Sequence, residues 1–238
     1  ADAERMHFFA SILSSQVVLT YGFSTTADYR ATNLQLNEIG SFNYDVTRQN
    51  QVVASIELSV PGEHNVLNAL GVFAVLAQTG FAPSKIANAL KLFAGTARRF
   101  EIIGDVNGIT VIDDYAHHPA KIEATLAAAR NRFPSRRIIA VWQPHTYSRS
   151  KALAADFAAS FHNADLVVIS EIYASREKLE DFSSLQIAES ITYTRWEFIP
   201  TLSEIGTFLL NELKAGDVLI ILSAGDANQI CKSVIDGL

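Results

Sequence analysis

The first part of the chain carries the hydrophobic pattern of β-strands. In four stretches between residues 16 and 60, aromatic and β-branched residues cluster or alternate with polar ones, and turn residues separate the stretches. Such stretches are typical of strands. The predicted strands cover residues 16–23, 29–36, 41–48 and 51–60.

The period of the pattern changes after Asn65. Apolar residues then recur every three or four positions up to Ala77, which predicts a helix that Gly80 ends. Residues 83–93 predict a second helix, with Ser84 as its cap. We therefore expect two helices directly behind the β-rich segment.

The segment GTARRFE, residues 95–101, interrupts the helical pattern and precedes a new strand pattern. This change predicts a junction between two domains, residues 1–94 and residues 95–238. Asn107 and Gly108 then predict a two-residue hairpin turn, because both residue types tolerate the positive φ angles that such a turn requires.

Beyond the hairpin, short apolar strands alternate with helical patterns. Strands are predicted at residues 109–115, 136–142, 165–170, 194–199 and 217–222. Helices are predicted at residues 119–133, 150–162, 184–192, 201–213 and 225–235. Continuously apolar strands separated by helices predict an α/β fold, with a mostly parallel sheet covered on both faces.

Polar motifs follow four of these strands directly. They are DDYAHH, QPHTYSR, SEIYASREK and SAGDAN. Ligands of open parallel sheets bind beyond the carboxyl ends of the strands. The sequence therefore predicts a single functional edge of the sheet in the second domain.

Composition narrows the classes of function. Of 238 residues, 49% are hydrophobic and 18% charged, which is typical of a globular chain. The net charge of −6 argues against a nucleic-acid partner, although local arginines suffice for a nucleotide. No apolar run approaches the ~20 residues that span a bilayer, so we expect no membrane partner. The single Cys231 excludes an internal disulfide framework and favours a reducing cytoplasm.

The turn DDYAHHP combines two acids, an aromatic residue and two histidines. Pro119 suits the first position of a helix, so His117 and His118 lie where the helix dipole favours neutral imidazole. Asp113 and Asp114 end the strand and could bind ribose hydroxyls or the water shell of a cation. An Asp cap with solvent-exposed histidines explains the same residues equally well.

Two further motifs have a binding and an ordinary interpretation. In GEHNVLNAL, Asn65 and Asn68 share a helix face next to His64, and their amides suit the edge of an adenine ring. An ordinary Asn cap is the alternative. Arg98 and Arg99 could bind phosphate oxygens at the junction, or they could be solvated charges.

The remaining strand-end motifs are weaker. QPHTYSR carries His145, Tyr147 and Arg149, of which the arginine could pair with a carboxylate; a generic polar loop is the alternative. SAGDAN supplies Gly225 and Asp226, a weak signal for phosphate or for a close backbone approach.

Several catalytic motifs are absent from the sequence. It has no G-x-G-x-x-G, which counts against a dinucleotide dehydrogenase, and no G-x-x-x-x-G-K-[ST] phosphate loop. It also lacks G-x-S-x-G and H-E-x-x-H, so a hydrolase has no support.

Five motifs of this chain, taken together in their order and spacing, resemble those of the Mur ligases, the ATP-dependent amino-acid ligases of peptidoglycan synthesis. The motifs are GEHNVLNAL, ARRFE, DDYAHHPAKIEATL, QPHTYSR and SAGDANQI. The resemblance extends from about Val17 onward. It implies the last part of a central ATPase domain followed by a Rossmann-like C-terminal domain. The phosphate-loop lysine, and the glutamate and histidine that hold Mg²⁺ in these ligases, would belong to a missing half, so this chain alone is expected to be inactive. The start at Ala1 fits a processed product or a part of a longer protein.

Within that family, DYAHHP followed by QPHTYSR is similar to the branch that joins L-alanine to UDP-N-acetylmuramate. That reaction passes through an acyl phosphate formed with ATP. Two alternatives stay open, namely a ligase that recycles murein tripeptide and a nucleotide-binding module without catalytic activity.

The resemblance also implies roles for individual residues. The residues that it assigns to ATP are His64, Asn65, Asn68, Arg99 and Asp114. The residues that it assigns to the L-alanine pocket are Tyr115, His117, His145 and Arg149. Arg99 and His117 would take part in catalysis, and no metal ligand is expected in this chain. Some family members carry an arginine where this chain has Thr146, which weakens the inferred preference for alanine.

Overall fold

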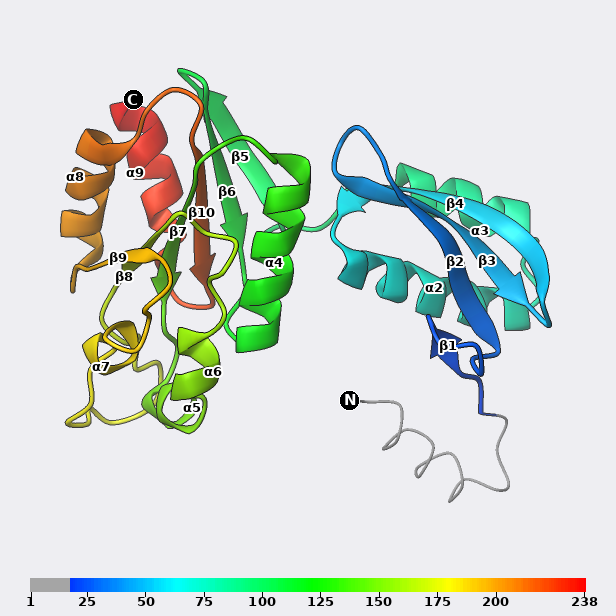
Figure 1. Ribbon diagram of the computed structural model, residues 1–238, viewed down its shortest axis with the longest axis horizontal. Helices are drawn as coiled ribbons and strands as arrows, with labels where there is room; N and C mark the ends of the chain where they lie inside the picture. The colour runs from blue at the N-terminus through cyan, green and yellow to red at the C-terminus, as the bar shows by residue number, and fades with distance from the viewer. Residues whose placement is uncertain (1–17) are drawn as a thin grey trace. The chain divides into compact units, whose positions relative to one another are not determined.

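The computed structural model describes residues 18–238, which form two compact units (Figure 1). The first unit takes most of the chain up to Phe93, and the second takes Ala94–Leu238 together with two short earlier segments, Leu36–Ser41 and Ser59–Glu63.

Among the described residues, the first unit pairs a four-stranded sheet with two helices. Its strands lie in the order β1-β2-β3-β4. Their bounds are β1 Tyr21–Gly22, β2 Tyr29–Leu36, β3 Ser41–Arg48 and β4 Gln51–Pro61. The helices are α2 Glu63–Gln78 and α3 Pro83–Leu92. Three of the predicted strands and both helices are confirmed, whereas the predicted strand 16–23 shrinks to β1 and begins outside the described residues.

The core of the first unit explains why α2 follows the strands. The buried side of this helix carries Val66, Leu70 and Phe73, which pack against Tyr29 of β2 and its neighbours. The ring centroids of Tyr29 and Phe73 are 6.1 Å apart in an edge-on arrangement. The prediction of Ser84 as a cap is wrong: α3 begins at Pro83, and Ala82 precedes it without a side-chain cap. Proline at the first position already has a helical φ angle, so the helix starts there.

The second unit is built on a six-stranded sheet in the order β5-β6-β10-β7-β8-β9. The strands are β5 Glu101–Val106, β6 Ile109–Asp114, β7 Ile138–Gln143, β8 Leu166–Ile169, β9 Arg195–Phe198 and β10 Val218–Ser223. The hairpin strand β5 is antiparallel to β6, and the other pairs are parallel. The predicted α/β fold with a mostly parallel sheet is confirmed.

The predicted hairpin turn is also confirmed. Asn107 and Gly108 connect β5 to β6 with φ angles of 53° and 78°.

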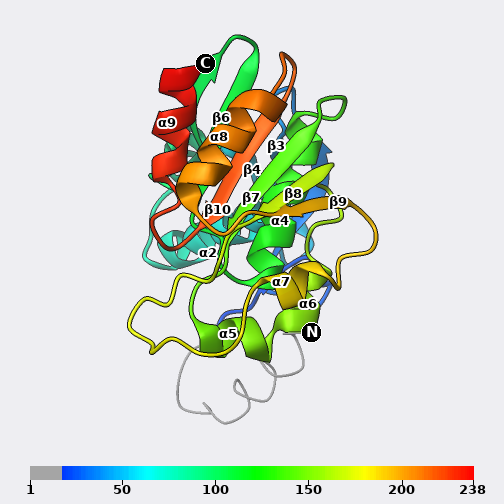
Figure 2. The same ribbon diagram turned by 90° about the vertical axis from the view of Figure 1, so that its left-hand side faces the viewer.

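Helices cover both faces of this sheet, as Figures 1 and 2 show. The helices are α4 Pro119–Arg132, α5 Tyr147–Ala152, α6 Ala154–Ala158, α7 Leu185–Ala188, α8 Leu202–Glu212 and α9 Gln229–Gly237. One face packs Trp142 and Ile220 against α4 and α6, and the other packs Val141 and Ile221 against α8 and α9. Alternate residues of β6, β7, β8 and β10 therefore enter different cores, as the pleat of a strand requires.

Three predicted helices differ from the structure. The helix expected at 184–192 is only one turn long, α7. The helix expected at 150–162 is two short helices, α5 and α6, separated by Leu153, whose ψ angle of 21° breaks the helical backbone. The helix expected at 225–235 begins only at Gln229. Ala227 lies in the turn before it, and its N–H donates to the side chain of Gln143 instead of taking part in the helix.

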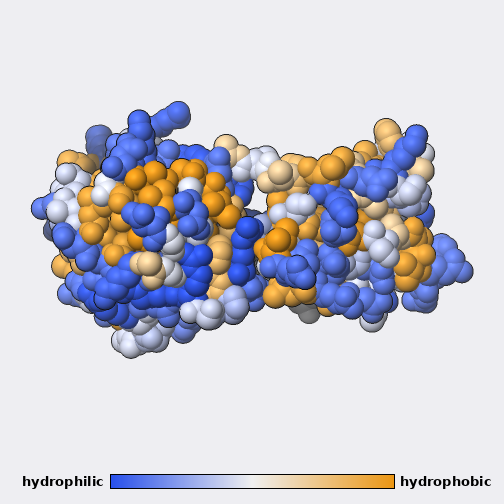
Figure 3. All heavy atoms as spheres, turned by 90° about the horizontal axis from the view of Figure 1, so that it is seen from above, coloured by the Kyte–Doolittle hydropathy of each residue, from blue (hydrophilic) through white to orange (hydrophobic). Residues whose placement is uncertain are grey.

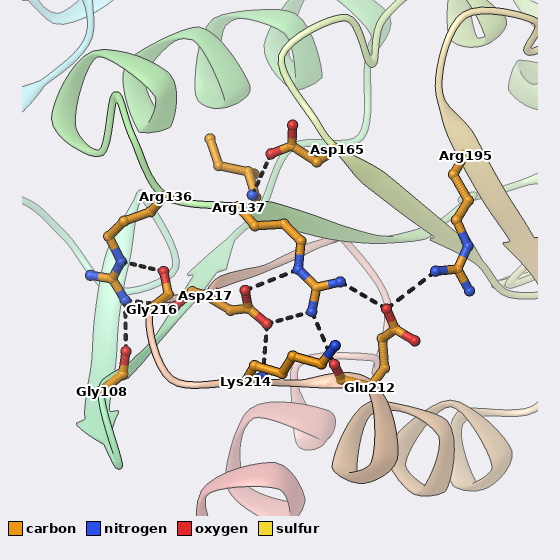
Figure 4. A network of polar contacts seen from close by, with 10 residues as sticks. Gly108, Arg136, Arg137, Asp165, Arg195, Glu212, Lys214, Gly216 and Asp217 are labelled. Carbon is orange, nitrogen blue, oxygen red and sulfur yellow. Dashed lines mark hydrogen bonds and ion pairs between the residues drawn. The ribbon is translucent and has the colours of Figure 1, made fainter.

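A charged network closes the amino end of the sheet (Figure 4). Arg137 donates to both carboxylate oxygens of Asp217, at 3.0 and 2.6 Å, and to Oε1 of Glu212 at 2.8 Å. Arg136 donates to the backbone oxygens of Gly108, Gly216 and Asp217. These bonds join β7, β10, the β5–β6 turn and the end of α8, so they stabilise the edge opposite to the polar strand-end motifs.

Candidate functional site

The polar strand-end motifs of the second unit come together at one edge of the sheet. β10 pairs with both β6 and β7, and β7 pairs with β8, all in parallel register, so their carboxyl ends lie side by side. The loops after β7 and β8 also form an isolated bridge between His145 and Tyr173. The fold therefore brings the polar motifs together at one edge of the sheet, as the sequence predicts.

A row of four rings crosses this edge. Tyr115 and His117 lie with ring centroids 5.3 Å apart, His117 and His145 6.3 Å apart, and His145 and Tyr173 5.6 Å apart. The rings come from the loops after β6, β7 and β8, three separate parts of the sequence. Fold topology alone brings them together.

The hydrogen bond of His117 assigns its tautomer. Nδ1 of His117 is 2.9 Å from the carbonyl oxygen of Tyr115, and a carbonyl only accepts, so Nδ1 carries a proton. In neutral imidazole, Nε2 is then an acceptor. His118 is exposed and stands just before Pro119, the first residue of α4, so of the two histidines His117 is the one turned into the row of rings.

Arg149 contacts His145 from the same loop and helix. Its Nη1 lies 3.4 Å from both Nδ1 and the carbonyl oxygen of His145. Burial lowers the pKa of His145, and the charges of Arg149 and His117 lower it further. A neutral imidazole next to a guanidinium is therefore favoured at this edge, an arrangement that suits an anionic group such as a carboxylate.

The backbone between His145 and Arg149 is strained. Thr146 has a φ of 71° and a ψ of 139°, and a positive φ is uncommon for a β-branched residue. The N–H of Thr146 donates to the carbonyl oxygen of Tyr173 at 2.9 Å. Such strain at a loop persists only where its surroundings fix it, and it concentrates at functional sites.

The tandem arginines at the junction have different surroundings. Arg98 is half-buried and donates from Nε to Asp113 at 3.1 Å and from Nη2 to the carbonyl oxygen of Ser223 at 2.8 Å. Arg99 is exposed, with its guanidinium carbon 5.4 Å from the centre of the Tyr115 ring. Arg98 thus joins the ends of β6 and β10, and Arg99 is the arginine that can reach a ligand.

Asp114 joins the junction to the strand-end turn. Its Oδ2 accepts from the N–H of Phe100 at 2.7 Å, and its Oδ1 from the N–H of Ala116 at 2.8 Å. Burial raises the pKa of Asp114, and these two amide bonds partly offset that effect. Each carboxylate oxygen can accept a second hydrogen bond, so the carboxylate has capacity left for a ligand.

The turn after β10 is held by Gln143. Oε1 of this buried amide accepts from Ser223 Oγ at 2.7 Å and from the N–H of Ala227 at 3.1 Å. Its Nε2 donates to Asp226 at 2.8 Å. Gly225 and Asp226, which the sequence marks as a weak phosphate signal, thus belong to a turn that the end of β7 fixes.

The first unit contains the other group of predicted residues. His64 and Asn65 lie half-buried in the first turn of α2, and Asn68 is exposed one turn later. Nδ2 of Asn68 donates to Oδ1 of Asn65 at 3.1 Å, so the shared helix face that the sequence predicts is present.

Two residues of the strand-end edge, Tyr173 and Gln143, were not identified from the sequence. The motif SEIYASREK marks the loop after β8, but nothing in it distinguishes Tyr173 from its neighbours. Gln143 is the last residue of a buried strand and has no special spacing. Only the pairing of β7 with β8 and β10 places both residues beside His145 and Gly225.

Within residues 18–238, no group of three or more His, Cys, Asp or Glu side chains could hold a metal ion. Over the same residues, no helix has the length and apolar character needed to cross a membrane. On the face drawn in Figure 3, both apolar and polar side chains form patches.

Comparison with known proteins gives a consistent result. The family model described as Mur ligase, glutamate ligase domain, matches residues 98–225, and the one described as Mur ligase middle domain matches residues 1–76. The UDP-N-acetylmuramate–L-alanine ligase of Caldanaerobacter subterraneus is 38% identical over 99% of this chain and 51% of the relative. That of Clostridium acetobutylicum is 42% identical over 97% of this chain and 50% of the relative. The chain therefore spans about half the length of these curated relatives.

Solved structures agree with these matches. The UDP-N-acetylmuramate-alanine ligase of Thermotoga maritima superposes with a TM-score of 0.80 at 27% identity, over 95% of this chain and 49% of that one. A murein peptide ligase of Psychrobacter arcticus superposes with a TM-score of 0.68 at 27% identity, over 96% of this chain and 48% of that one.

Proposed function

This chain belongs to the Mur ligase family, and on that premise we propose that it supplies the second half of a ligase that joins L-alanine to UDP-N-acetylmuramate with ATP. Residues 1–94 would be the end of the ATP-binding domain, and residues 95–238 the C-terminal ligase domain. Relatives 38% and 42% identical to nearly all of this chain carry that activity in their names.

The proposed reaction has two steps. The muramate carboxylate attacks the γ-phosphorus of ATP, which breaks the bond to the β-phosphate oxygen and gives an acyl phosphate and ADP. The neutral amine of L-alanine then attacks the acyl carbon, phosphate leaves, and the nitrogen loses one of its two protons as the amide forms. Both steps require close placement of the reacting atoms and cations near the transferring phosphoryl group.

The observation that supports this function best is the cluster of Tyr115, His117, His145 and Arg149 at one sheet edge. Arg149 would pair with the carboxylate of L-alanine, and the neutral imidazole of His145 would lie beside that pair. Nε2 of His117 would accept a hydrogen bond from the amino group and orient its lone pair for attack. The ring of Tyr115 would form the wall next to His117.

The nucleotide residues are assigned by position in the family motifs. His64, Asn65 and Asn68 would contact adenine, and Asp114 would accept from the ribose hydroxyls. Arg99, which is exposed while Arg98 is engaged with Asp113, would stabilise negative charge on the phosphates. The described residues offer no Mg²⁺ site, so no step of the reaction is assigned to a metal held by this chain.

The test uses an assembled ligase, in which this chain is joined to the remaining half of the Caldanaerobacter relative. We expect phosphate release that requires ATP, UDP-N-acetylmuramate and L-alanine together. This chain alone should not hydrolyse ATP. Activity with murein tripeptide and none with L-alanine would instead favour a recycling ligase, and release of phosphate in neither case would reject the proposed function.

The variant Arg149→Ala makes the test specific. It should raise the KM for L-alanine at least about 10-fold, because loss of a charge-assisted pair costs about 1.5–3 kcal/mol. The KM for ATP should change little. An unchanged KM for L-alanine would remove Arg149 from the amino-acid pocket.

A further inference from the structure

The loop after β8 has no role in the proposed chemistry, yet two backbone hydrogen bonds join its residue Tyr173 to the loop that carries His145. The N–H of Tyr173 donates to the carbonyl oxygen of Pro144 at 2.8 Å, and its carbonyl oxygen accepts from the N–H of Thr146 at 2.9 Å. These bonds clamp the backbone of Tyr173 directly across from His145. The backbone of Tyr173, from which the ring extends, is therefore fixed relative to His145.

His145 is enclosed on three sides by identified groups. The His117 ring lies 6.3 Å away, the Tyr173 ring 5.6 Å away at an interplanar angle of 31°, and Nη1 of Arg149 approaches Nδ1 at 3.4 Å. The contact with His117 is longer and more tilted, with an angle of 56°. Tyr173 therefore gives the imidazole its closest ring contact.

The absence of a side chain at Gly225 leaves room for the Tyr173 ring. A Cβ at this glycine would stand 2.9 Å from Cγ of Tyr173 and 2.5 Å from Oε1 of Gln143. Gln143 cannot move aside readily, since Oε1 accepts from Ser223 and Ala227. Any side chain at position 225 would thus displace the Tyr173 ring, which gives a packing reason for the glycine in SAGDAN.

We propose that Tyr173, packed on Gly225, is a positioning residue that holds the imidazole of His145 in the orientation that the L-alanine pocket requires. This inference rests on the proposed function. It assigns the role to the ring rather than to the hydroxyl group, because the contact with His145 is a ring contact.

The first experiment measures steady-state kinetics in the assembled ligase. Tyr173→Ala should raise the KM for L-alanine about 10-fold, which corresponds to about 1.4 kcal/mol, and leave the KM for ATP within about 2-fold. Tyr173→Phe keeps the ring and should restore most of the affinity. Gly225→Ala should raise the KM for L-alanine in the same direction as Tyr173→Ala.

A double-variant cycle separates positioning from general damage. Because Tyr173 acts through His145, adding Tyr173→Ala to His145→Ala should raise the KM for L-alanine no further. Effects that multiply would overturn the proposal. So would a Tyr173→Ala variant with an unchanged KM for L-alanine while Arg149→Ala still raises it; that outcome leaves the proposed function intact. Absence of any alanine-dependent turnover in the unmodified ligase rejects the proposed function and, with it, the role of Tyr173.

A second measurement uses this chain alone and needs no activity. The NMR signals of the His145 ring should shift in Tyr173→Ala, while those of His162 should not. The matched control is Tyr193→Ala, since the Tyr193 ring stacks on the His162 ring with centroids 3.8 Å apart. His162 precedes β8 and Tyr193 precedes β9. That variant should shift the His162 signals and leave His145 unchanged. A His145 signal indifferent to the loss of Tyr173 would overturn the positioning role.

Discussion

Arg98 donates from Nε to Oδ2 of Asp113 across 3.1 Å, and this pair binds the start of the second unit to the end of its first parallel strand. The arginine side chain is 27% exposed and the aspartate 5%. Arg98 also has a φ of 56°, a conformation that costs energy in a non-glycine residue unless the surroundings hold it. Both features indicate that Arg98 stabilises the fold. The exposed Arg99 makes no such ion pair with Asp113.

The first prediction follows from that pair. Arg98→Ala should lower the free energy of unfolding of the second unit by about 2–4 kcal/mol, because it leaves a buried carboxylate without its cation. For a unit of this size, that loss lowers Tm by roughly 5–12 °C. Scanning calorimetry of the chain measures the transition. Arg99→Ala is the matched control and should shift the transition by less than about 2 °C. Equal shifts for both variants would contradict the different roles of the two arginines.

A second prediction concerns the amino end of the sheet. Arg137 makes four hydrogen bonds, two to the Asp217 carboxylate and two to Glu212. Arg137→Ala should destabilise the second unit by about 2–4 kcal/mol, and Arg137→Lys should recover only part of this, since an ammonium cannot form the bidentate pair.

The neighbouring Arg195 provides the control for that measurement. Its side chain is 53% exposed and it pairs with Glu197 and Glu212 at the surface. Arg195→Ala should leave the free energy of unfolding nearly unchanged, because exposed ion pairs contribute little to stability. Urea unfolding of the three variants measures the differences. Because this edge lies opposite to the site, none of the three variants should alter the KM for L-alanine in the assembled ligase.

Local patterns predicted most of the elements. The strands at 29–36 and 41–48 match their predicted limits, because alternation along a strand and a turn on either side are both visible in a short window. The hairpin at Asn107 and Gly108 was predictable for the same reason. Helix limits were predicted less accurately where a side chain distant in sequence binds the helix end, as Gln143 does before the start of α9.

The lateral arrangement was not visible in the sequence. β10 lies between β6 and β7, although it is the last strand in the chain, and only tertiary packing decides this order. The insertion places Ser223 next to Arg98 and Gly225 next to Tyr173. Local patterns therefore predicted the strand-end edge as a site but treated Arg98 and Arg99 alike. The family resemblance assigned a role to Arg99, and neither source identified Tyr173.

A third prediction uses the lowered pKa of His145. A histidine whose pKa lies below its unfolded value of ~6.5 binds fewer protons in the folded chain, so stability is lost as the pH falls through that value. Above it the imidazole is neutral in both states and contributes no pH dependence. The variant His145→Asn should therefore lose less in Tm between about pH 7.5 and about pH 5.5 than the unmodified chain.

Two carboxyl groups at the end of β6 act differently in acid. Burial raises the pKa of Asp113 and Asp114 above the usual 3.8, so these carboxyls favour the folded state as they protonate at falling pH. They are present in both chains, and the difference between the two melting curves isolates His145. Parallel curves over this range would show that His145 titrates as it does in the unfolded chain.

The last prediction concerns Cys231, the chain's one cysteine, which is 3% exposed on α9. Burial, assisted by the negative charge of Asp113, raises the pKa of its thiol to about 12. Since only the thiolate reacts, on the order of one molecule in ten thousand is reactive near pH 8, and the buried position reduces access further. The native chain should resist a disulfide reagent for hours, whereas the chain in denaturant should react with one equivalent within about a minute. In Arg98→Ala, labelling under native conditions should become faster, because loss of the Arg98–Asp113 pair raises the population of opened molecules; labelling of the native chain at the unfolded rate would contradict the burial of this thiol.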